Sequence, residues 1–206
     1  ITVGTLSTTD DDAGDSHVYA LVSGTGDTDN SSFDISSNNL LSAESFNYES
    51  QDSYAIRIKT TDSGGSIYEE SFTINILDIN EAPDITFQSG VDPANIEFDE
   101  NSNEVVVDIG STDVDDGSTA TYSISGGLDA SDFSINSSTG ELTFITSPNF
   151  ESPADSDGNN KYLVTVTATD NGSLTDSETL TINVQNVNDP PIVSAVTGTG
   201  LEDGII

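Results

Sequence analysis

Acidic side chains recur in this sequence at equivalent turns. Asp10 and Asp12 form an Asp-x-Asp pair, and Asp113 and Asp115 form a second pair 103 residues later. Side chains two residues apart in a loop can converge on one ion while the backbone between them turns, and carboxylate oxygens are the ligands that hard cations prefer. The chemistry that this spacing suits is therefore cation binding.

Further acids follow the same repetition. Glu49 corresponds to Glu151, and Asp62 corresponds to Asp170. Two more polar segments, DINEAP at residues 78–83 and NVNDPP at residues 186–191, lie 108 residues apart. An alternative interpretation, that the acids form solvated faces adapted to salty water, stays open for the acidic residues as a whole. It does not explain their placement at matching strand ends.

Among the common cations, calcium fits these groups best. Calcium takes about six to eight oxygen ligands from carboxylates, amides, backbone carbonyls and water. Zinc is poorly served, because His17 is the single histidine and the chain has no cysteine. Magnesium prefers fewer protein ligands and retains more water. Clustered carboxylates would also repel one another without a cation.

The composition argues against several classes of function. The chain has 206 residues, with 37 Asp and Glu against 3 Lys and Arg, which gives a formal net charge of −34. We expect no nucleic-acid partner and no binding to an anionic membrane, because both need cationic side chains. No apolar run approaches the roughly 20 residues of a transmembrane helix, so we expect no membrane insertion. The absence of cysteine excludes disulfides and a cysteine nucleophile.

We also expect no catalysis. His17 lies beside a turn without a G-x-S-x-G segment, so it is not expected to belong to a hydrolase triad. Carboxylate pairs for glycoside hydrolysis are recognised by their separation in space, but the sequence has no evident active-site insertion. The segments 27–30 and 155–158 are Asp-rich, and we interpret both as loops rather than extra calcium sites.

The elements that position the acids are predicted to be β-strands. Apolar residues alternate with polar ones with a period of two, which indicates antiparallel sheets with one buried face. Turn clusters rich in Gly, Ser and Asn separate these runs, and no stretch shows a sustained helical period. The fold class is therefore all-β, with tandem seven-stranded Greek-key β-sandwiches joined end to end. The alternating apolar residues are Tyr54, Ile56, Ile58, Phe72, Ile74, Ile76, Tyr162, Val164, Val166, Leu180, Ile182 and Val184.

The repeat defines the expected domains. Residues 61–83 match residues 169–191 at a constant offset of 108. We expect residues 1–82 to be one repeat without its first strand, residues 83–190 a complete repeat, and residues 191–206 the start of a third. The chain opens directly in an alternating segment without a signal peptide, so we expect it to be a piece of a larger protein.

The motifs resemble those of cadherin repeats. DINEAP and NVNDPP resemble the D-x-N-D-x-P linker, and STDVDDG at 111–117 resembles the D-x-D loop. NYE at 47–49 and NFE at 149–151 resemble the D-x-E motif, and FDENS at 98–102 is similar to the segment with the first-strand glutamate. GLDASDFSINSSTGELTF at 127–144 resembles the middle of bacterial cadherin-like repeats, which occur in large secreted or surface-anchored proteins, including adhesins. The resemblance covers nearly all of residues 1–191.

The resemblance implies calcium-binding linkers. At the first junction the implied ligands are Glu49, Asp78, the carbonyl of Asn80, Glu81, Asp113, Asp115 and Asp170. At the second junction they are Glu100, Glu151, Asn188 and Asp189, and the corresponding acids of the first repeat are Asp10, Asp12 and Asp62. Asn47 and Asn149 stand where the family usually has Asp, which removes one charge from the outermost ion site in each case.

Two functions are compatible with these features. The first is a non-catalytic, calcium-stiffened extender or adhesion module of an extracellular or cell-surface bacterial protein. Its partners would be calcium ions and neighbouring repeats of the same chain. The alternative is a module that binds carbohydrate or another cadherin-like domain. A sugar-binding face needs exposed aromatic residues, but the chain lacks Trp, and we assign Tyr19, Tyr54, Tyr122 and Tyr162 to the core.

Overall fold

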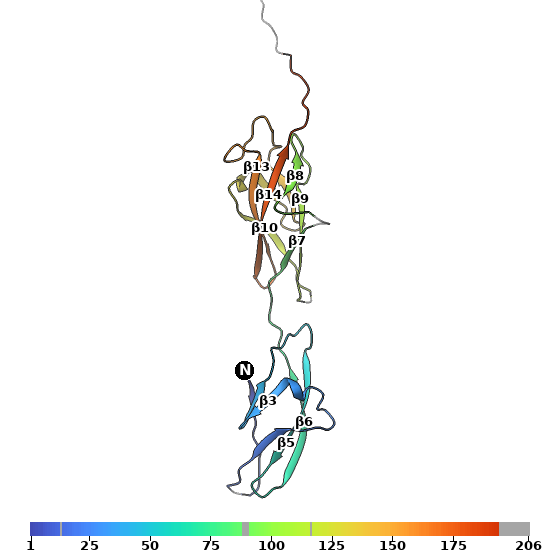
Figure 1. Ribbon diagram of the computed structural model, residues 1–206, viewed down its shortest axis with the longest axis vertical. Coiled ribbons are helices and arrows are strands. Elements are labelled where there is room, and N and C mark those ends of the chain that lie inside the picture. The colour runs from blue at the N-terminus through green and yellow to red at the C-terminus, as the bar shows by residue number, and fades with distance from the viewer. Residues whose placement is uncertain (13, 88–90, 116, 194–206) are drawn as a thin grey trace, which may run out of the picture. The chain divides into compact units, whose positions relative to one another are not determined.

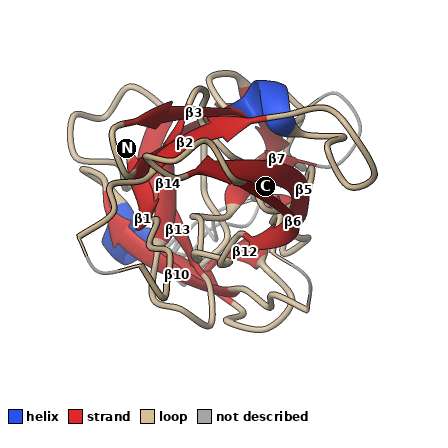
Figure 2. Ribbon diagram, turned by 90° about the horizontal axis from the view of Figure 1, so that it is seen from below, coloured by secondary structure: helices blue, strands red, loops and turns tan. Residues whose placement is uncertain are grey.

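A computed structural model describes residues 1–12, 14–87, 91–115 and 117–193. Within these ranges the structure is all-β, with two short 3-10 turns at Asn30–Ser32 and Ala130–Asp132 and no α-helix (Figure 2). The chain divides into two compact units, unit 1 (Ile1–Glu81) and unit 2 (Ala82–Ile206). The expected start of a third repeat falls mostly on residues 194–206, which lie outside the described residues.

Unit 2 is a sandwich of two four-stranded sheets, with strand orders β11-β12-β9-β7 and β10-β13-β14-β8 (Figure 1). Strands β8 and β14 pair in parallel, and the other pairs are antiparallel. The strands are β7 (Asp84–Phe87), β8 (Ile96–Asp99), β9 (Val107–Thr112), β10 (Thr121–Gly126), β11 (Phe133–Ile135), β12 (Glu141–Phe144), β13 (Lys161–Thr169) and β14 (Thr175–Gln185).

The first strand of unit 2 is divided between the two sheets. β7 pairs with β9 in one sheet, and β8, the next strand along the chain, pairs with β14 in the other. A sandwich of seven sequence segments therefore contains eight described strands. The predicted β-sandwich is confirmed. The alternation of apolar and polar residues did not predict that the first segment of unit 2 is divided between the two sheets.

Unit 1 repeats the later part of this arrangement. Its described strands form two three-stranded sheets, with orders β1-β4-β3 and β2-β5-β6. No counterpart of β7 or β8 occurs among the residues of unit 1 that the structure describes. The strands are β1 (Thr2–Thr5), β2 (Val18–Leu21), β3 (Phe33–Ser36), β4 (Asn39–Ser42), β5 (Ser53–Thr61) and β6 (Ile67–Asn75).

The core follows the predicted period of two along β5, β13 and the second half of β14, but not along β6, where Phe72 is 40% exposed. Along β13, alternate residues from Tyr162 to Ala168 are buried, and the same alternation runs along β5. Burial of each large apolar side chain contributes about 1.5–3 kcal/mol. An aromatic pair recurs at the centre: Tyr54 meets Phe33 edge-on in unit 1, and Tyr162 meets Phe133 edge-on in unit 2. Tyr54 and Tyr162 are buried, as the sequence predicted.

The other two predicted core tyrosines lie at the edges of these cores. Tyr19 and Tyr122 are half-buried and pack against the apolar clusters of unit 1 and unit 2, respectively. The same two residues hydrogen-bond to hydroxyl side chains, Thr8 and Ser111, at 3.1 Å in both units. They therefore act as structural aromatics with a polar tip, which agrees with their assignment to the core.

Candidate metal centres

Three predicted ligands of unit 2 lie together at one end of the sandwich. Glu100 directly follows β8, Asp189 follows β14, and Glu151 lies in the loop between β12 and β13. Because β8 and β14 are parallel neighbours, their C-terminal ends lie at the same end of the sheet, and the chain leaves both strands there. One carboxylate oxygen from each of the three residues lies within 4.8 Å of the other two.

Glu100 is the buried member of this group. Its residue is 3% exposed, and its two oxygens accept hydrogen bonds from the backbone N–H groups of Phe150 and Val187, each at 2.8 Å. These bonds lower the pKa of Glu100 below its ordinary value, although burial acts in the opposite direction. Glu100 is therefore held as a carboxylate at neutral pH.

Each of the other two carboxylates accepts a hydrogen bond from one asparagine side chain. Asn186 Nδ2 donates to Glu151 Oε1 at 2.6 Å, and Asn101 Nδ2 donates to Asp189 Oδ1 at 3.1 Å. The donor set of this group is oxygen alone, without histidine or cysteine, and includes one carboxylate that is desolvated and ionised. That chemistry fits a calcium ion and does not fit zinc.

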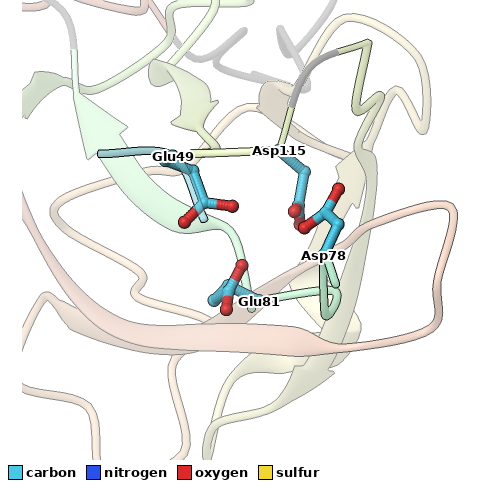
Figure 3. Close-up of side chains that lie close together, drawn as sticks. All are labelled: Glu49, Asp78, Glu81 and Asp115. Atoms are coloured by element: carbon cyan, nitrogen blue, oxygen red, sulfur yellow. The ribbon is translucent and has the colours of Figure 1, made fainter. Parts of the chain in front are cut away.

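A second group lies at the end of unit 1. Glu49, Asp78 and Glu81 direct their carboxylates toward a common space, and one oxygen of each lies within 4.8 Å of the other two (Figure 3). All three residues are exposed. Asn80 Nδ2 donates to the backbone oxygen of Glu81 at 3.0 Å, and Asn188 makes the equivalent bond to Asp189 at 3.4 Å. The two linkers thus share a local conformation around their predicted ligands.

The two Asp-x-Asp loops have the same internal hydrogen bond. Asp113 Oδ1 accepts the N–H of Asp115, and Asp10 Oδ1 accepts the N–H of Asp12, both at 3.0 Å. The Ser118 hydroxyl donates to Asp113 Oδ2 at 2.7 Å, and this bond is the main cause of the lowered pKa of Asp113. Each loop therefore presents an ionised first aspartate.

In unit 1 this loop holds a third acid that the sequence did not single out. Asp15 joins Asp10 and Asp12, with one oxygen of each within 4.8 Å of the others. His17 Nε2 lies 3.1 Å from Asp10 Oδ2. The hydrogen bond from the Asp12 N–H is the largest cause of the lowered pKa of Asp10, and His17 adds to it. The signal was present as the fourth acid of the segment DDDAGD.

Asp62 and Asp170 close equivalent hairpin turns. Asp62 Oδ1 accepts the N–H of Ser66, and Asp170 Oδ1 accepts the N–H of Leu174, both at 2.8 Å. Asp170 is buried and Asp62 is half-buried. Neither residue belongs to a three-carboxylate group within the described ranges. Asp62 therefore stabilises the turn between β5 and β6, and Asp170 stabilises the turn between β13 and β14. Both residues also remain candidate metal ligands.

The two asparagines that replace the family's usual Asp also have a structural role. Asn47 Oδ1 accepts the N–H of Ser50 at 2.8 Å, and Asn149 Oδ1 accepts the N–H of Ser152 at 2.7 Å. An amide oxygen satisfies these turns as well as a carboxylate would. The replacement keeps the turn and removes one negative charge beside Glu49 and Glu151.

Two buried acids have structural roles: Asp129, which sequence reasoning missed, and Asp155, which it considered only as part of the loop 155–158. Asp129 is 4% exposed, and its oxygens accept the N–H groups of Ser156 and Leu163. Asp155 is 6% exposed and accepts the N–H groups of Asn159 and Asn160. These bonds hold the segment 155–158 as a loop, as interpreted above. The corresponding residue of unit 1, Asp29, accepts the N–H of Ala55 at 2.7 Å.

The sequence is similar to that of known cadherin-type proteins. Residues 94–185, within unit 2, match the family described as Cadherin domain. Unit 2 therefore resembles a cadherin domain. The chain is 34% identical over 200 residues, 91% of its length, to Protocadherin-like wing polarity protein stan of Drosophila melanogaster, and 30% identical over 187 residues, 88% of its length, to human Protocadherin Fat 4. It spans only 5% and 4% of these two relatives.

Solved structures support the same fold. Human protocadherin-24 EC1-2 is similar with a TM-score of 0.66 and 19% identity, covering 91% of this chain and 88% of that one. Drosophila N-cadherin EC1-4 is similar with a TM-score of 0.65 and 14% identity, covering 89% of this chain and 45% of that one. The fold is therefore a cadherin-type β-sandwich. The relatives named here are animal proteins, so the bacterial origin stays a prediction.

No helix within the described ranges has the length and apolar character needed to cross a membrane.

Proposed function

We propose that the chain consists of non-catalytic, calcium-binding cadherin-like repeats that serve as extender and adhesion modules of an extracellular or cell-surface protein. Calcium at the linkers would neutralise clustered carboxylates and restrict the motion of neighbouring repeats. The parent protein would be a large adhesin, and the bacterial origin implied by residues 127–144 belongs to this proposal.

The observation that carries the proposal is the environment of Glu100. Glu100 is 3% exposed, and two backbone N–H groups hold its carboxylate ionised and fixed in position, so it presents a permanent negative charge at this end of the sandwich. The carboxylates of Glu151 and Asp189 lie within 4.8 Å, so the group concentrates negative charge. A divalent cation would stabilise all three carboxylates together.

We assign the remaining ligands by the family motifs. At the linker of residues 78–83 the proposed ligands are Glu49, Asp78, the Asn80 carbonyl, Glu81, Asp113, Asp115 and Asp170. At the following linker they are Glu100, Glu151, Asn188 and Asp189. Asp10, Asp12 and Asp62 are the equivalent acids of unit 1. The grouping of Glu49 with Asp78 and Glu81 inside unit 1 supports the first assignment.

The adhesion role rests on the relatives. One similar solved structure, covering 84% of this chain at 23% identity with a TM-score of 0.55, is described as the Protocadherin GammaB4 extracellular domain. Another, with 26% identity and a TM-score of 0.54, is described as a Protocadherin gammaB7 EC3-6 cis-dimer. That second description favours pairing with another cadherin-like domain as the second candidate function, ahead of carbohydrate binding.

Calorimetric titration of the chain with calcium tests the proposal. We expect binding with Kd values of about 10⁻⁴ to 10⁻³ M. Glu151→Gln should weaken the calcium affinity of one class of sites about tenfold, because it removes a negative charge from the group of Glu100, Glu151 and Asp189. Glu151 is exposed, so the substitution should not disturb the core. Glu97→Gln is the matched control, since Glu97 is exposed on the neighbouring strand β8 outside the group.

Two outcomes would overturn the proposal. One is the absence of calcium binding at millimolar concentrations in a chain that is folded by circular dichroism. The other is an equal effect of Glu151→Gln and Glu97→Gln, which would mean that calcium only screens the surface charge.

A further inference from the structure

The sequence contains three Asn-x-Ser segments, at residues 30–32, 136–138 and 171–173. In this motif the side-chain nitrogen of the asparagine can take up a sugar, provided that the segment is exposed to the modifying enzyme. The motif is short and arises often by chance, so the local structure has to decide among the three asparagines. All three segments lie in the described ranges, and their surroundings differ.

Asn30 is held by hydrogen bonds at both ends of its amide. Its Nδ2 donates to the backbone oxygen of Val22 at 2.9 Å, and its Oδ1 accepts the N–H of Arg57 on β5 at 2.9 Å. Asn30 is also half-buried. A sugar on Nδ2 would have to fit between the two backbone segments that this amide joins. The folded chain therefore does not present Asn30 to an enzyme.

Asn171 is exposed in the turn between β13 and β14. Its Oδ1 lies 3.3 Å from the hydroxyl oxygen of Ser118. The N–H of Ser173, the third residue of the motif, donates to the backbone oxygen of Asp170 at 3.3 Å. The amide of Asn171 thus contacts the Asp-x-Asp loop, and the motif is not folded around its asparagine.

Asn136 is exposed and forms a turn with the rest of its own motif. It directly follows β11, and residues 136–139 are all exposed. Asn136 Oδ1 accepts the N–H of Ser138 at 3.0 Å and the N–H of Thr139 at 3.3 Å, which is an Asx turn. Its Nδ2, the atom that would carry the sugar, has no hydrogen-bond partner among the residues that the structure describes. Asn136 alone combines exposure, a compact motif and an available nitrogen.

Backbone hydrogen bonds fix the position of this turn. The N–H of Gly140 donates to the backbone oxygen of Asn136 at 2.9 Å. The N–H of Tyr122 on β10 donates to the backbone oxygen of Ser137 at 3.0 Å. The asparagine is therefore presented without any local unfolding. The equivalent turn of unit 1, residues 36–39, is shorter and contains no such motif.

We propose that Asn136 is a site of N-glycosylation. The donor is a glycosyl diphosphate, either a nucleotide sugar or a lipid-linked oligosaccharide. Nδ2 of Asn136 forms a bond to the anomeric carbon of the sugar, and the bond from that carbon to the diphosphate oxygen breaks. The diphosphate leaves with the electron pair, and the proton displaced from Nδ2 goes to a base of the transferase. A glycan suits the extracellular or cell-surface location of the proposed function, but the site does not depend on calcium.

A glycan at Asn136 also restricts where a partner protein can bind. A bulky, hydrated sugar covers the turn of residues 136–140 and keeps this surface out of close contact with other proteins. No residue of the turn belongs to a three-carboxylate group within the described ranges, so the glycan and the candidate metal centres are compatible.

Modification of the purified, folded chain by a soluble asparagine glucosyltransferase with UDP-glucose tests the site. Peptide mass spectrometry should locate the sugar on Asn136 and find Asn30 unmodified. Asn171 should react at least about tenfold more slowly, because it must give up its contact with Ser118 to form the turn. Synthetic peptides of the three segments provide the reference rates, since no fold constrains them. Modification of Asn30 in the folded chain, or equal relative rates for Asn136 and Asn171, would overturn the inference.

Secretion of the chain from a eukaryotic cell tests the lipid-linked donor. We expect a glycan on Asn136 that an amidase removes with conversion of the asparagine to aspartate. Ser138→Ala should abolish this glycan because the motif loses its hydroxyl group, whereas Ser138→Thr should retain it. Ser32→Ala and Ser173→Ala are the matched controls in the other two motifs and should leave it in place. Modification in one of the two experiments alone identifies the donor and supports the site, and a folded chain without sugar at Asn136 in both would overturn it.

Discussion

Asp129 and Asp132 lie three residues apart in unit 2, and their surroundings shift their pKa values in opposite directions. Burial tends to raise the pKa of Asp129, but hydrogen bonds from the backbone N–H groups of Leu163 and Ser156 outweigh it and lower the pKa. The pKa of Asp132 is raised by burial and by the charges of Asp129 and Asp155. Asp129 therefore stabilises the folded state as an anion, whereas the charge of Asp132 opposes folding.

Substitution of these two residues should change stability with opposite signs. At pH 7, Asp129→Asn should destabilise unit 2 by about 1–3 kcal/mol, because the buried N–H groups lose a charged acceptor. Asp132→Asn should be neutral or slightly stabilising. The stabilisation from Asp129 is present above its unfolded pKa of about 3.9 and is lost as pH falls through its lower folded pKa.

Urea unfolding of the three proteins at pH 7 and at pH 3 measures this difference. The penalty of Asp129→Asn should be smaller at pH 3, as more of the parent is then protonated. A penalty that is independent of pH, or an equal penalty for both variants, would contradict the electrostatic account.

The candidate sites show what residue patterns can predict. Recurrence across the two repeats selected Glu151 and Asp189, and the resemblance of residues 98–102 to a cadherin segment selected Glu100. The structure brings these three residues together. Recurrence did not select Asp129, although Asp29 and Asp129 stand four residues before Phe33 and Phe133. The reason is physical: the role of Asp129 comes from a hydrogen bond that it accepts from the backbone N–H of Leu163, a residue of a strand distant in the sequence. A local pattern around Asp129 does not contain that partner.

At the scale of elements, the turn between β11 and β12 depends on one glycine. Gly140 has a φ of 78°, and a Cβ at this position would overlap the backbone oxygen of Ile109 on β9. The Gly140 oxygen also accepts the N–H of Ile109 at 3.1 Å. A side chain would therefore separate β12 from β9 as well as strain the turn.

Gly140→Ala should destabilise unit 2 by more than the roughly 1–3 kcal/mol typical of a strained backbone position. Gly158→Ala is the matched control, because Gly158 has a φ of 71° but no atom within 4 Å of its added Cβ. It should cost about 1 kcal/mol from the left-handed conformation alone. Thermal unfolding compares the two variants, and equal losses would mean that the contact with Ile109 relaxes without cost.

The elements themselves were predictable to different extents. The strict alternation of Tyr162, Val164 and Val166 predicted β13, because one face of that strand is fully buried. The division of the first segment into β7 and β8 was not predictable, because both pieces alternate in the same way. Which sheet each piece joins is decided by the exposed edges of β9 and β14, and no local pattern encodes that choice.

At the scale of the whole molecule, the net charge of −34 is the dominant property. Such an excess of one sign destabilises compact states through self-repulsion. Only three basic side chains are available to offset it, and the ion pair between Arg57 and Glu69 uses one of them. Cations from the solvent must therefore supply most of the compensation, either by general screening or by binding at specific sites.

A comparison of calcium with sodium should distinguish binding at specific sites from general screening. A ligand that binds only the folded state stabilises it by RT ln(1 + [L]/Kd), which is about 0.4–1.4 kcal/mol per site at 1 mM calcium for Kd values of about 10⁻³ to 10⁻⁴ M. For domains of this size, that corresponds to an increase of several degrees in the unfolding midpoint per site. NaCl relieves repulsion by screening alone and should raise the midpoint much less at the same ionic strength.

Scanning calorimetry of the parent, Asp115→Ala and Val114→Ala, each in calcium and in NaCl at matched ionic strength, tests the specific route. Asp115→Ala should lose most of the calcium-specific increase and keep the NaCl response, because it removes one proposed ligand but only one of 37 acids. Val114→Ala should behave as the parent does, since Val114 is 60% exposed and offers no side-chain oxygen. If NaCl reproduces the whole calcium effect, the acids serve as a salt-adapted surface. If Asp115→Ala responds to calcium as the parent does, Asp115 is not a ligand, and the calcium-specific stabilisation must come from other carboxylates, of which the group around Glu100 is the first to examine.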